Sequence, residues 1–259
     1  MIKNKLKISV PGFLAGGISV GIKKKDQKDL GLIYSTVPAR AAAMFTKNTF
    51  KAAPLLINED RVKRGIAQAI ITNSGCANAA TGKEGIRDAL IVSGALSREL
   101  AIREELILLG STGVIGKRLP VKKIEGGIGK LVKGLRETGI EDAEKAMMTT
   151  DKYPKIAIRK GVIGAKDITI CGIAKGAGMI EPNMATLLTY VMTDALIDYR
   201  ALNTVFHQAI NATFNSISVD GCMSTNDMAI ILANGLAGNN PLEKDRKSTR
   251  LNSSHRLTS

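Results

Sequence analysis

Apolar positions along the chain follow two alternating patterns, one typical of helices and one typical of buried strands. An apolar residue every three or four positions predicts helices at about 83–100, 120–136, 141–149 and 198–213. Short runs rich in Ile, Leu and Val predict strands at 67–73, 107–110, 155–158, 167–173, 186–192 and 228–233. The two kinds of element alternate without a repeat or a low-complexity linker. The pattern therefore predicts a mixed α/β fold.

Length and composition are those of a globular protein. The 259 residues suit one large domain or two small ones, and a hydrophobic content of 44% is ample for a core. The three cysteines are odd in number and lack metal-ligand spacing, which predicts small core residues in a reducing compartment. The basic N-terminus precedes an apolar stretch, but Pro11, Gly12 and Gly16 interrupt it, and no run could span a bilayer. We expect a cytoplasmic protein without a membrane partner.

The formal net charge of +14 invites a nucleic-acid-binding interpretation, which the rest of the sequence does not favour. Aromatic residues make up only 3% of the chain, so surfaces on which bases could stack are scarce. The basic residues are scattered, with no recognisable nucleic-acid module around them. A solvated, charged surface is the better explanation, and it could mildly attract an anionic substrate such as glutamate. We expect no nucleic-acid partner.

The most informative segment runs from Lys175 to Thr186 and reads Lys-Gly-Ala-Gly-Met-Ile-Glu-Pro-Asn-Met-Ala-Thr. If the Ala185–Thr186 bond is cut, Thr186 gains a free α-amine beside its own hydroxyl, which makes a nucleophile and a base within one residue. The ordinary pKa of an α-amine, about 7.7–8.0, leaves much of it neutral near physiological pH. On the residues alone, however, a threonine that opens an apolar run is more often just the first residue of a strand.

Acyl transfer also needs hydrogen-bond donors for the oxyanion, and Ser111-Thr112-Gly113 could supply them. The strand expected at 107–110 would deliver these residues to its end, where the Thr112 hydroxyl and the Gly113 N–H could converge on one oxygen. A simple tight turn is the better interpretation of these three residues by themselves. A phosphate-binding loop at 110–117 is disfavoured, because one residue too many separates its glycines and Arg118 replaces the Ser or Thr that binds Mg²⁺.

These segments and several others, in the same order, resemble the bifunctional ornithine acetyltransferase / glutamate N-acetyltransferase family of arginine biosynthesis. The matching motifs extend to about Gly238 and are Pro11-Gly12-Phe13, Phe45-Thr46-Lys47-Asn48, Ala52-Ala53-Pro54, Asn73-Ser74-Gly75-Cys76-Ala77-Asn78-Ala79, Ser111-Thr112-Gly113-Val114-Ile115-Gly116, Met148-Thr149-Thr150-Asp151, residues 175–186, Val219-Asp220-Gly221 and Ser224-Thr225-Asn226-Asp227. So many ordered matches are far more specific than any single motif.

The resemblance implies an activity and a set of site residues. Acetyl would move from N2-acetylornithine to glutamate, with Thr186 as the nucleophile after self-cleavage at Ala185–Thr186. The residues at the oxyanion would be Thr112 and Gly113. The substrate contacts would be Thr149, Lys175 and Thr186, and Thr150 is an alternative to Thr149 one position away.

The resemblance also implies the architecture and assembly. It implies layered helices over β-sheets in a self-processing, amidohydrolase-like fold. Residues 1–185 would form an α chain and 186–244 the start of a β chain, in an α2β2 heterotetramer without metal or cofactor. Some members of the family also use acetyl-CoA, and the sequence does not say whether this chain does. Glu181, Leu187 and Cys222-Met223 depart from the residues usual in the family, and none of these changes removes a catalytic group.

The last residues, 245–259, read like the translation of a sequencing adapter, so we expect them to be a non-native tail. The family's Asp-Gly-Glu-Gly-Ala-Thr-Lys type segment and the C-terminal residues that close its substrate site are not found in this sequence. We therefore expect a C-terminally truncated copy.

Two other classes of protein fit the same features. A self-processing amidohydrolase or aminopeptidase of similar architecture would release a hydrolysed product without an acceptor. A non-catalytic binding protein or an inactive fragment would leave the Ala185–Thr186 bond intact.

Overall fold

The computed structural model describes residues 8–24, 26–178, 188–217 and 224–243. Its strands are β1 (Phe13–Ile18), β2 (Leu30–Phe45), β3 (Ile66–Cys76), β4 (Ile107–Val114), β5 (Lys155–Ile163), β6 (Lys166–Lys175), β7 (Leu188–Thr193) and β8 (Met228–Ala233). Its α-helices are α1 (Ala53–Arg61), α2 (Gly82–Leu100), α3 (Val121–Lys133), α4 (Ile140–Met147) and α5 (Tyr199–Ala212). Short 3₁₀ turns follow α1, precede β4 and follow α5.

The long strand β2 connects two halves of the sheet. The strand order is β4-β3-β2-β8-β7-β6-β5, with β1 paired to β2. The first part of β2, from Leu30 to Tyr34, pairs with β1 and β3, whereas its last part, from Arg40 to Phe45, pairs with β8. The register between β2 and β3 shifts between these two parts. Most neighbours are antiparallel, but β3–β4 and β7–β8 are parallel pairs.

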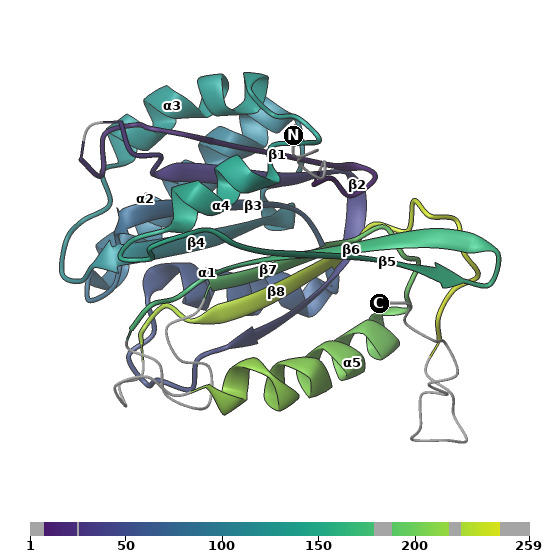
Figure 1. Ribbon diagram of the computed structural model, residues 1–259. Coiled ribbons are helices and arrows are strands. Elements are labelled where there is room, and N and C mark those ends of the chain that lie inside the picture. Colours follow the sequence, from purple (N-terminus) through teal and green to yellow (C-terminus); the bar gives the residue numbers. More distant parts are fainter. Residues whose placement is uncertain (1–7, 25, 179–187, 218–223, 244–259) are drawn as a thin grey trace.

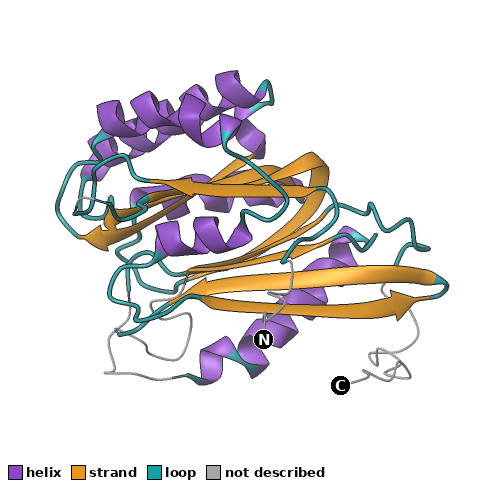
Figure 2. Ribbon diagram, turned by 45° about the horizontal axis from the view of Figure 1, so that its top comes forward, coloured by secondary structure: helices purple, strands orange, loops and turns teal. Residues whose placement is uncertain are grey.

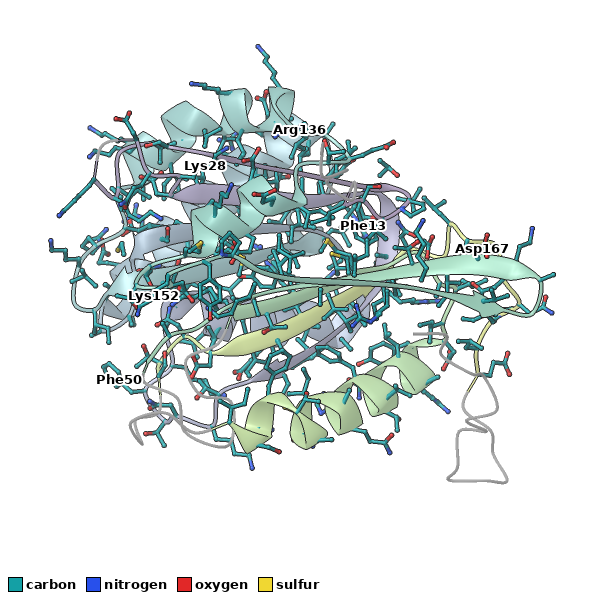
Figure 3. All side chains as sticks on the ribbon, viewed as in Figure 1. Phe13, Lys28, Phe50, Arg136, Lys152 and Asp167 are labelled. Carbon is teal, nitrogen blue, oxygen red and sulfur yellow. The ribbon has the colours of Figure 1, made fainter. Side chains whose placement is uncertain are left out.

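The two halves of the sheet pack face to face between outer layers of helices (Figures 1 and 2). Alternation of side chains along β2 builds these layers, because successive residues of a strand point to opposite faces. Leu32 packs with α2 and α3, whereas the adjacent Ile33 packs in the cluster between the sheet halves. Further along, Ala41 belongs to that central cluster and Ala42 to the cluster beneath α5. The result is a layered arrangement of helices over β-sheets, as expected, in which α4 contributes Ile140, Ala143 and Met147 to the central cluster. Side chains fill the space between the layers (Figure 3).

Helix α4 lies close to β1 and β2 because glycine faces it on both strands. A Cβ at Gly17 would lie 2.7 Å from the carbonyl carbon of Asp142, and a Cβ at Gly31 would lie 2.9 Å from the carbonyl oxygen of Ala143. No side chain fits between backbones that approach so closely. The close packing fixes the end of α4 and therefore the residues after it, Met148-Thr149-Thr150.

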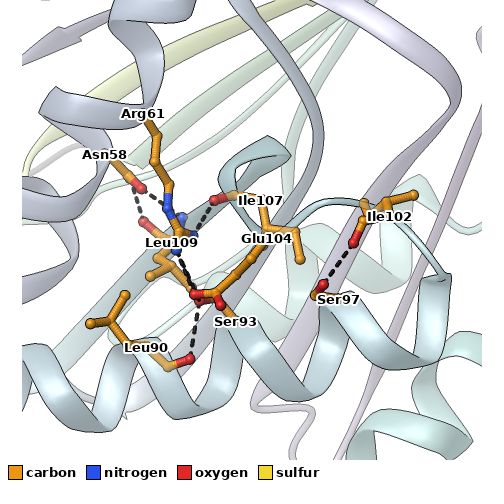
Figure 4. Close-up of polar contacts among 9 residues, drawn as sticks. All are labelled: Asn58, Arg61, Leu90, Ser93, Ser97, Ile102, Glu104, Ile107 and Leu109. Atoms are coloured by element: carbon orange, nitrogen blue, oxygen red, sulfur yellow. Dashed lines mark hydrogen bonds and ion pairs between the residues drawn. The ribbon is translucent and has the colours of Figure 1, made fainter.

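The outer edge of β4 is held by side chains of α1 (Figure 4). Asn58 donates from Nδ2 to the Leu109 carbonyl at 2.7 Å and accepts from the Leu109 N–H at 2.9 Å. Arg61 donates to the Ile107 carbonyl at 2.7 Å and forms an ion pair with Glu104 at 2.7 Å. Since β4 ends the strand order, these bonds satisfy polar backbone groups that no further strand reaches. They hold the strand that carries Ser111-Thr112-Gly113.

The expected elements are present, with two differences. The sequence pattern did not indicate β1, β2 or α1. In addition, Ser111, Thr112 and Gly113 were expected in a turn after a strand at 107–110, but they belong to β4 itself. Pairing with β3 extends the strand that far, since the register of the parallel pair continues to Gly113. The strand expected at 186–192 is described from Leu188 onwards.

Candidate active site

A cavity of about 560 Å³ opens where the ends of β3, β4 and β6 meet the segment that follows α4. The described residues that line it are Lys23, Gly75, Ala77, Thr112, Gly113, Val114, Ile115, Thr149, Thr150, Lys175, Ala177, Gly178, Ser224, Thr225 and Asn226. Four candidate residues from the sequence, Thr112, Gly113, Thr149 and Lys175, are thus brought together although 63 positions separate the first from the last.

Gly113 occupies a position that only glycine fits. Its φ of +130° lies in a region that L side chains rarely adopt. A Cβ at this position would also lie 2.7 Å from the backbone nitrogen of Cys76 on the neighbouring β3. The conformation coincides with the irregular register between Gly75 and Cys76, where the β3–β4 ladder ends. Gly113 is itself exposed and lines the cavity, so its backbone is accessible to a ligand there.

Lys175 is the last residue of β6 and is only 4% exposed. Its ammonium group donates to Thr112 Oγ1 at 3.2 Å. Because the Thr112 oxygen accepts in this bond, its hydroxyl hydrogen remains available to donate to another acceptor in the cavity. Burial lowers the pKa of Lys175, and the charges of Asp151 and Asp227 partly oppose this effect.

Asp151 fixes the segment that carries Thr149 and Thr150. Its Oδ2 accepts from the Thr149 N–H at 3.3 Å, and its Oδ1 accepts from the Gly176 N–H at 2.8 Å and from Lys155 Nζ at 2.6 Å. Burial acts to raise the pKa of Asp151, but these hydrogen bonds outweigh it and hold the pKa below its ordinary value. Both Thr149 and Thr150 line the cavity, so the choice between them as the substrate contact stays open.

Sequence reasoning missed several residues of the lining, among them Lys23 and Asn226. Asn226 is buried, and its Nδ2 donates to the carbonyls of Ala77 at 2.6 Å and Ser111 at 2.9 Å. It therefore ties the segment before β8 to the ends of β3 and β4. Ser224-Thr225-Asn226-Asp227 is one of the motifs that carry the family resemblance, and that signal could have identified this brace.

Ala185 and Thr186, the expected cleavage site and nucleophile, lie outside the described residues. The described chain resumes at Leu188, which is the register partner of Lys175 in the antiparallel β6–β7 pair. The roles expected for Thr112, Gly113, Thr149, Lys175 and Thr186 stay predictions.

Two cysteines and one histidine that could carry chemistry occupy structural positions in the described part of the chain. Cys76 and Cys171 are buried free thiols, and burial raises the pKa of both, that of Cys171 to about 11. His207 forms a hydrogen bond through Nε2 with the Ala43 carbonyl oxygen at 3.1 Å.

Across the described ranges, no cluster of three His, Cys, Asp or Glu side chains is placed to hold a metal ion. The same part of the chain has no helix long and apolar enough to cross a bilayer.

The fold places this chain in a known structural class. An L-aminopeptidase D-Ala-esterase/amidase from Ochrobactrum anthropi, described as a variant of the Ntn hydrolase fold, matches 87% of the chain and 72% of its own with a TM-score of 0.55. At 11% identity, this likeness shows the fold alone. An arginine biosynthesis bifunctional protein ArgJ from Bacillus halodurans matches 69% of this chain and 95% of its own, with a TM-score of 0.65 and 40% identity.

Within that class the chain belongs to the ArgJ family, whose model matches residues 14–256. The arginine biosynthesis bifunctional protein ArgJ of Geobacter sulfurreducens is 47% identical over 232 residues, which are 90% of this chain and 59% of that protein. The corresponding Bacillus subtilis protein is 44% identical, over 92% of this chain and 58% of that protein. The chain thus spans somewhat less than two thirds of the length of these relatives. An ornithine acetyltransferase from Mycobacterium tuberculosis, solved with ornithine, is 33% identical over 69% of this chain and 94% of its own, with a TM-score of 0.60.

Proposed function

We propose that this chain carries the site of a threonine-dependent acetyltransferase that moves acetyl from N2-acetylornithine to glutamate. The observation that carries the proposal is the convergence of Thr112, Gly113 and Lys175 on one cavity beside the start of β7. Leu188, two positions after Thr186 in the sequence, is paired with Lys175. The relatives named for arginine biosynthesis and the ornithine-bound acetyltransferase supply the substrate class.

The first step of the proposed chemistry is self-cleavage. Thr186 Oγ attacks the Ala185 carbonyl carbon, and the peptide C–N bond breaks as the acyl group moves from nitrogen to oxygen. Water then hydrolyses the resulting ester, which frees the Thr186 hydroxyl and leaves an α-amine on the same residue. The Thr112 hydroxyl and the Gly113 N–H stabilise the negative oxygen that develops on the carbonyl.

One comparison of lengths supports a division of the chain at this bond. The solved Bacillus halodurans chain is matched over 95% of its length by only 69% of this chain. The Geobacter sulfurreducens protein, in contrast, is matched over only 59% of its length by 90% of this chain. The solved chain is therefore much the shorter of the two relatives. The matched share of 69% is close to the fraction of the sequence that precedes Thr186. We infer an α chain of residues 1–185 and a β chain that begins at Thr186, assembled as an α2β2 heterotetramer in the cytoplasm.

The second step is a double-displacement transfer on the mature residue. The Thr186 amine takes the proton from Oγ, and Oγ attacks the acetyl carbonyl of N2-acetylornithine. The C–N bond breaks, ornithine leaves with the proton as its free amine, and an acetyl-threonine ester remains. The amine of glutamate then attacks this ester, which forms N-acetylglutamate and restores the Thr186 hydroxyl. Lysine charge near the site favours the neutral form of the α-amine. Acetyl-CoA is a second possible donor in the same cycle, and no metal or cofactor takes part.

The expressed chain, analysed by denaturing electrophoresis and intact-mass measurement, tests the first step. We expect two fragments separated at 185/186, their loss in Thr186→Ala, and their retention in Thr186→Ser, which keeps the hydroxyl. An uncut wild-type chain would contradict self-processing by this sequence.

Assays of N2-acetylornithine with and without glutamate test the second step. We expect ornithine release to depend on glutamate and to be matched by N-acetylglutamate. Release of ornithine and acetate without an acceptor would instead identify an amidohydrolase, and no turnover at all would indicate a non-catalytic protein.

A further inference from the structure

Lys23 lines the cavity, and the chemistry described above does not use it. It lies between β1 and β2, in a segment whose backbone is held by one buried carboxylate. Asp29 accepts from the N–H groups of Val20 at 2.7 Å, Ile22 at 2.6 Å and Lys23 at 3.0 Å. Three hydrogen bonds to a charged acceptor fix the turn firmly. The Lys23 side chain therefore starts from an ordered backbone and is itself half-buried.

The ammonium group of Lys23 has donors to spare. It donates to the carbonyl oxygen of Met148 at 2.9 Å, and an ammonium carries three donors in all. Among the residues that the structure describes, no carboxylate forms an ion pair with it. The oxygens of the neighbouring Asp29 and Asp151 accept hydrogen bonds from other groups. A neutral carbonyl holds the Lys23 ammonium in place without cancelling its charge.

The charged side chains that line the described part of the cavity are of one sign. Its described lining contains two lysines, Lys23 and Lys175, and no acidic residue. Burial lowers the pKa of Lys23, and the positive charge of Lys175 acts in the same direction, against the opposing charges of Asp29 and Asp151. Two lysines that repel one another across a cavity favour an anion between them. Each ammonium group donates one described hydrogen bond, but Lys175 is only 4% exposed whereas Lys23 is half-buried, so Lys23 is the more accessible of the two.

We propose that Lys23 binds the α-carboxylate of the amino-acid substrate in this cavity, an assignment that rests on the proposed acetyl transfer. In a double-displacement cycle, the donor and the acceptor occupy the same site in turn. The groups that N2-acetylornithine and glutamate share are the α-carboxylate and the nitrogen that carries acetyl. A site that accepts both molecules must recognise the α-carboxylate that they share. It must also tolerate the side-chain ammonium of N2-acetylornithine and the side-chain carboxylate of glutamate. Lys23 supplies the required positive charge at a fixed place.

A purely positioning role for Lys23 predicts a different result. Its bond to the Met148 carbonyl holds the residue before Thr149, so loss of the ammonium could displace Thr149 and Thr150. That displacement would weaken every ligand alike, whether or not the ligand carries a carboxylate. The ratio between a carboxylate and its uncharged amide therefore separates the two roles.

The experiment is equilibrium calorimetry of the expressed chain with N2-acetylornithine and with N2-acetylornithine α-carboxamide. We expect the wild type to bind the carboxylate at least tenfold more tightly, because charge-assisted hydrogen bonds are the stronger ones. Lys23→Met should reduce this preference to about twofold or less, and Lys23→Arg should restore part of it. Lys24→Met removes the adjacent exposed charge, which does not line the cavity, and should leave the preference unchanged. Lys23→Gln serves as the test variant if Lys23→Met unfolds.

The other outcomes distinguish a failure of this assignment from a failure of the proposed function. A preference that survives in Lys23→Met and Lys23→Gln excludes Lys23 as the carboxylate ligand. Equal weakening of both ligands assigns it a positioning role only, and a wild type that binds neither ligand or prefers neither removes the basis of the assignment. A Lys23-dependent preference without acetyl transfer would uphold the binding site and contradict the proposed function. Acetyl transfer with an unchanged KM for glutamate in Lys23→Met would uphold the proposed function and contradict the role of Lys23 in carboxylate binding.

Discussion

Lys175 Nζ and Thr112 Oγ1 form a hydrogen bond of 3.2 Å that joins the two halves of the sheet at the cavity. Thr112 lies in β4, at one end of the strand order, and Lys175 lies in β6, near the other end. The direction of the bond matters for catalysis. Because the lysine can only donate, the threonine oxygen accepts, and the threonine hydrogen is free for a ligand oxygen.

Thr112→Val should slow self-cleavage by about 100- to 1000-fold, since the loss of one oxyanion donor has an effect of that size in well-studied enzymes. Thr112→Ser keeps the hydroxyl and should cleave within a few-fold of the wild-type rate. The measurement is the rate at which the intact chain disappears, followed by intact mass in freshly refolded protein. Equal rates for Thr112→Val and Thr112→Ser would remove Thr112 from the oxyanion role.

Gly113→Ala should lower the free energy of unfolding by about 2–4 kcal/mol, because the new methyl group meets backbone atoms at an unfavourable φ. Gly116→Ala is the matched control. Its φ of +80° is also left-handed, but a Cβ there has nothing within 4 Å, so only the conformational cost of about 1–2 kcal/mol applies. Urea unfolding of both variants measures the difference. A Gly113→Ala variant no less stable than Gly116→Ala would contradict the close approach of β3 to β4.

Glu144 should make stability depend on pH. It is fully buried in α4, and its Oε1 accepts from the Lys155 N–H at 3.1 Å, while Oε2 has no partner within the described chain. Burial raises its pKa from 4.5 to about 7. The folded state therefore binds more protons than the unfolded state between these values, so the free energy of unfolding falls as pH rises from about 4.5 to above 7.

Glu144→Gln removes this titration and should be about 2–4 kcal/mol more stable than the wild type at pH 8, with little difference near pH 4. Urea unfolding from pH 4 to 8 measures the slope. Glu141→Gln, on the same helix but with a partly exposed side chain paired to Lys145, keeps Glu144 and should therefore keep the fall in stability between about pH 4.5 and 7. A wild type whose stability rises across this window would show that Glu144 does not govern it.

Asn58→Ala should lower the free energy of unfolding by about 2–4 kcal/mol, because two hydrogen bonds to Leu109 are lost together at a buried position. Asn58→Asp keeps the acceptor for the Leu109 N–H but turns a donor into an acceptor opposite the Leu109 carbonyl, so it should be at least as destabilising. Thermal unfolding measures both, and a neutral effect of Asn58→Ala would show that the β4 edge needs no brace from α1.

Local patterns in the sequence were sufficient to predict the helices that bury a single face against the rest of the protein. Helix α2 at Gly82–Leu100 and helix α5 at Tyr199–Ala212 each bury one face, so their apolar spacing gave bounds within about a residue or two. The layering of helices over β-sheets also agrees with the fold that the family resemblance implies, because many ordered motifs together identify a family more specifically than any one of them.

Tertiary structure alone decided β2 and the composition of the cavity. The sixteen residues of β2 include Gly31, Pro38 and several alanines, which do not form the short apolar run expected of a strand, and pairing with β1, β3 and β8 holds them extended. Lys23 reads in the sequence as one of three consecutive lysines on a solvated surface. It lines the cavity because Asp29 accepts hydrogen bonds that fix its turn, and because its ammonium group donates to the carbonyl of Met148, just after α4 and 125 positions away. Contacts between such distant positions leave no periodic trace along the chain, so the pattern of residues could not reveal them.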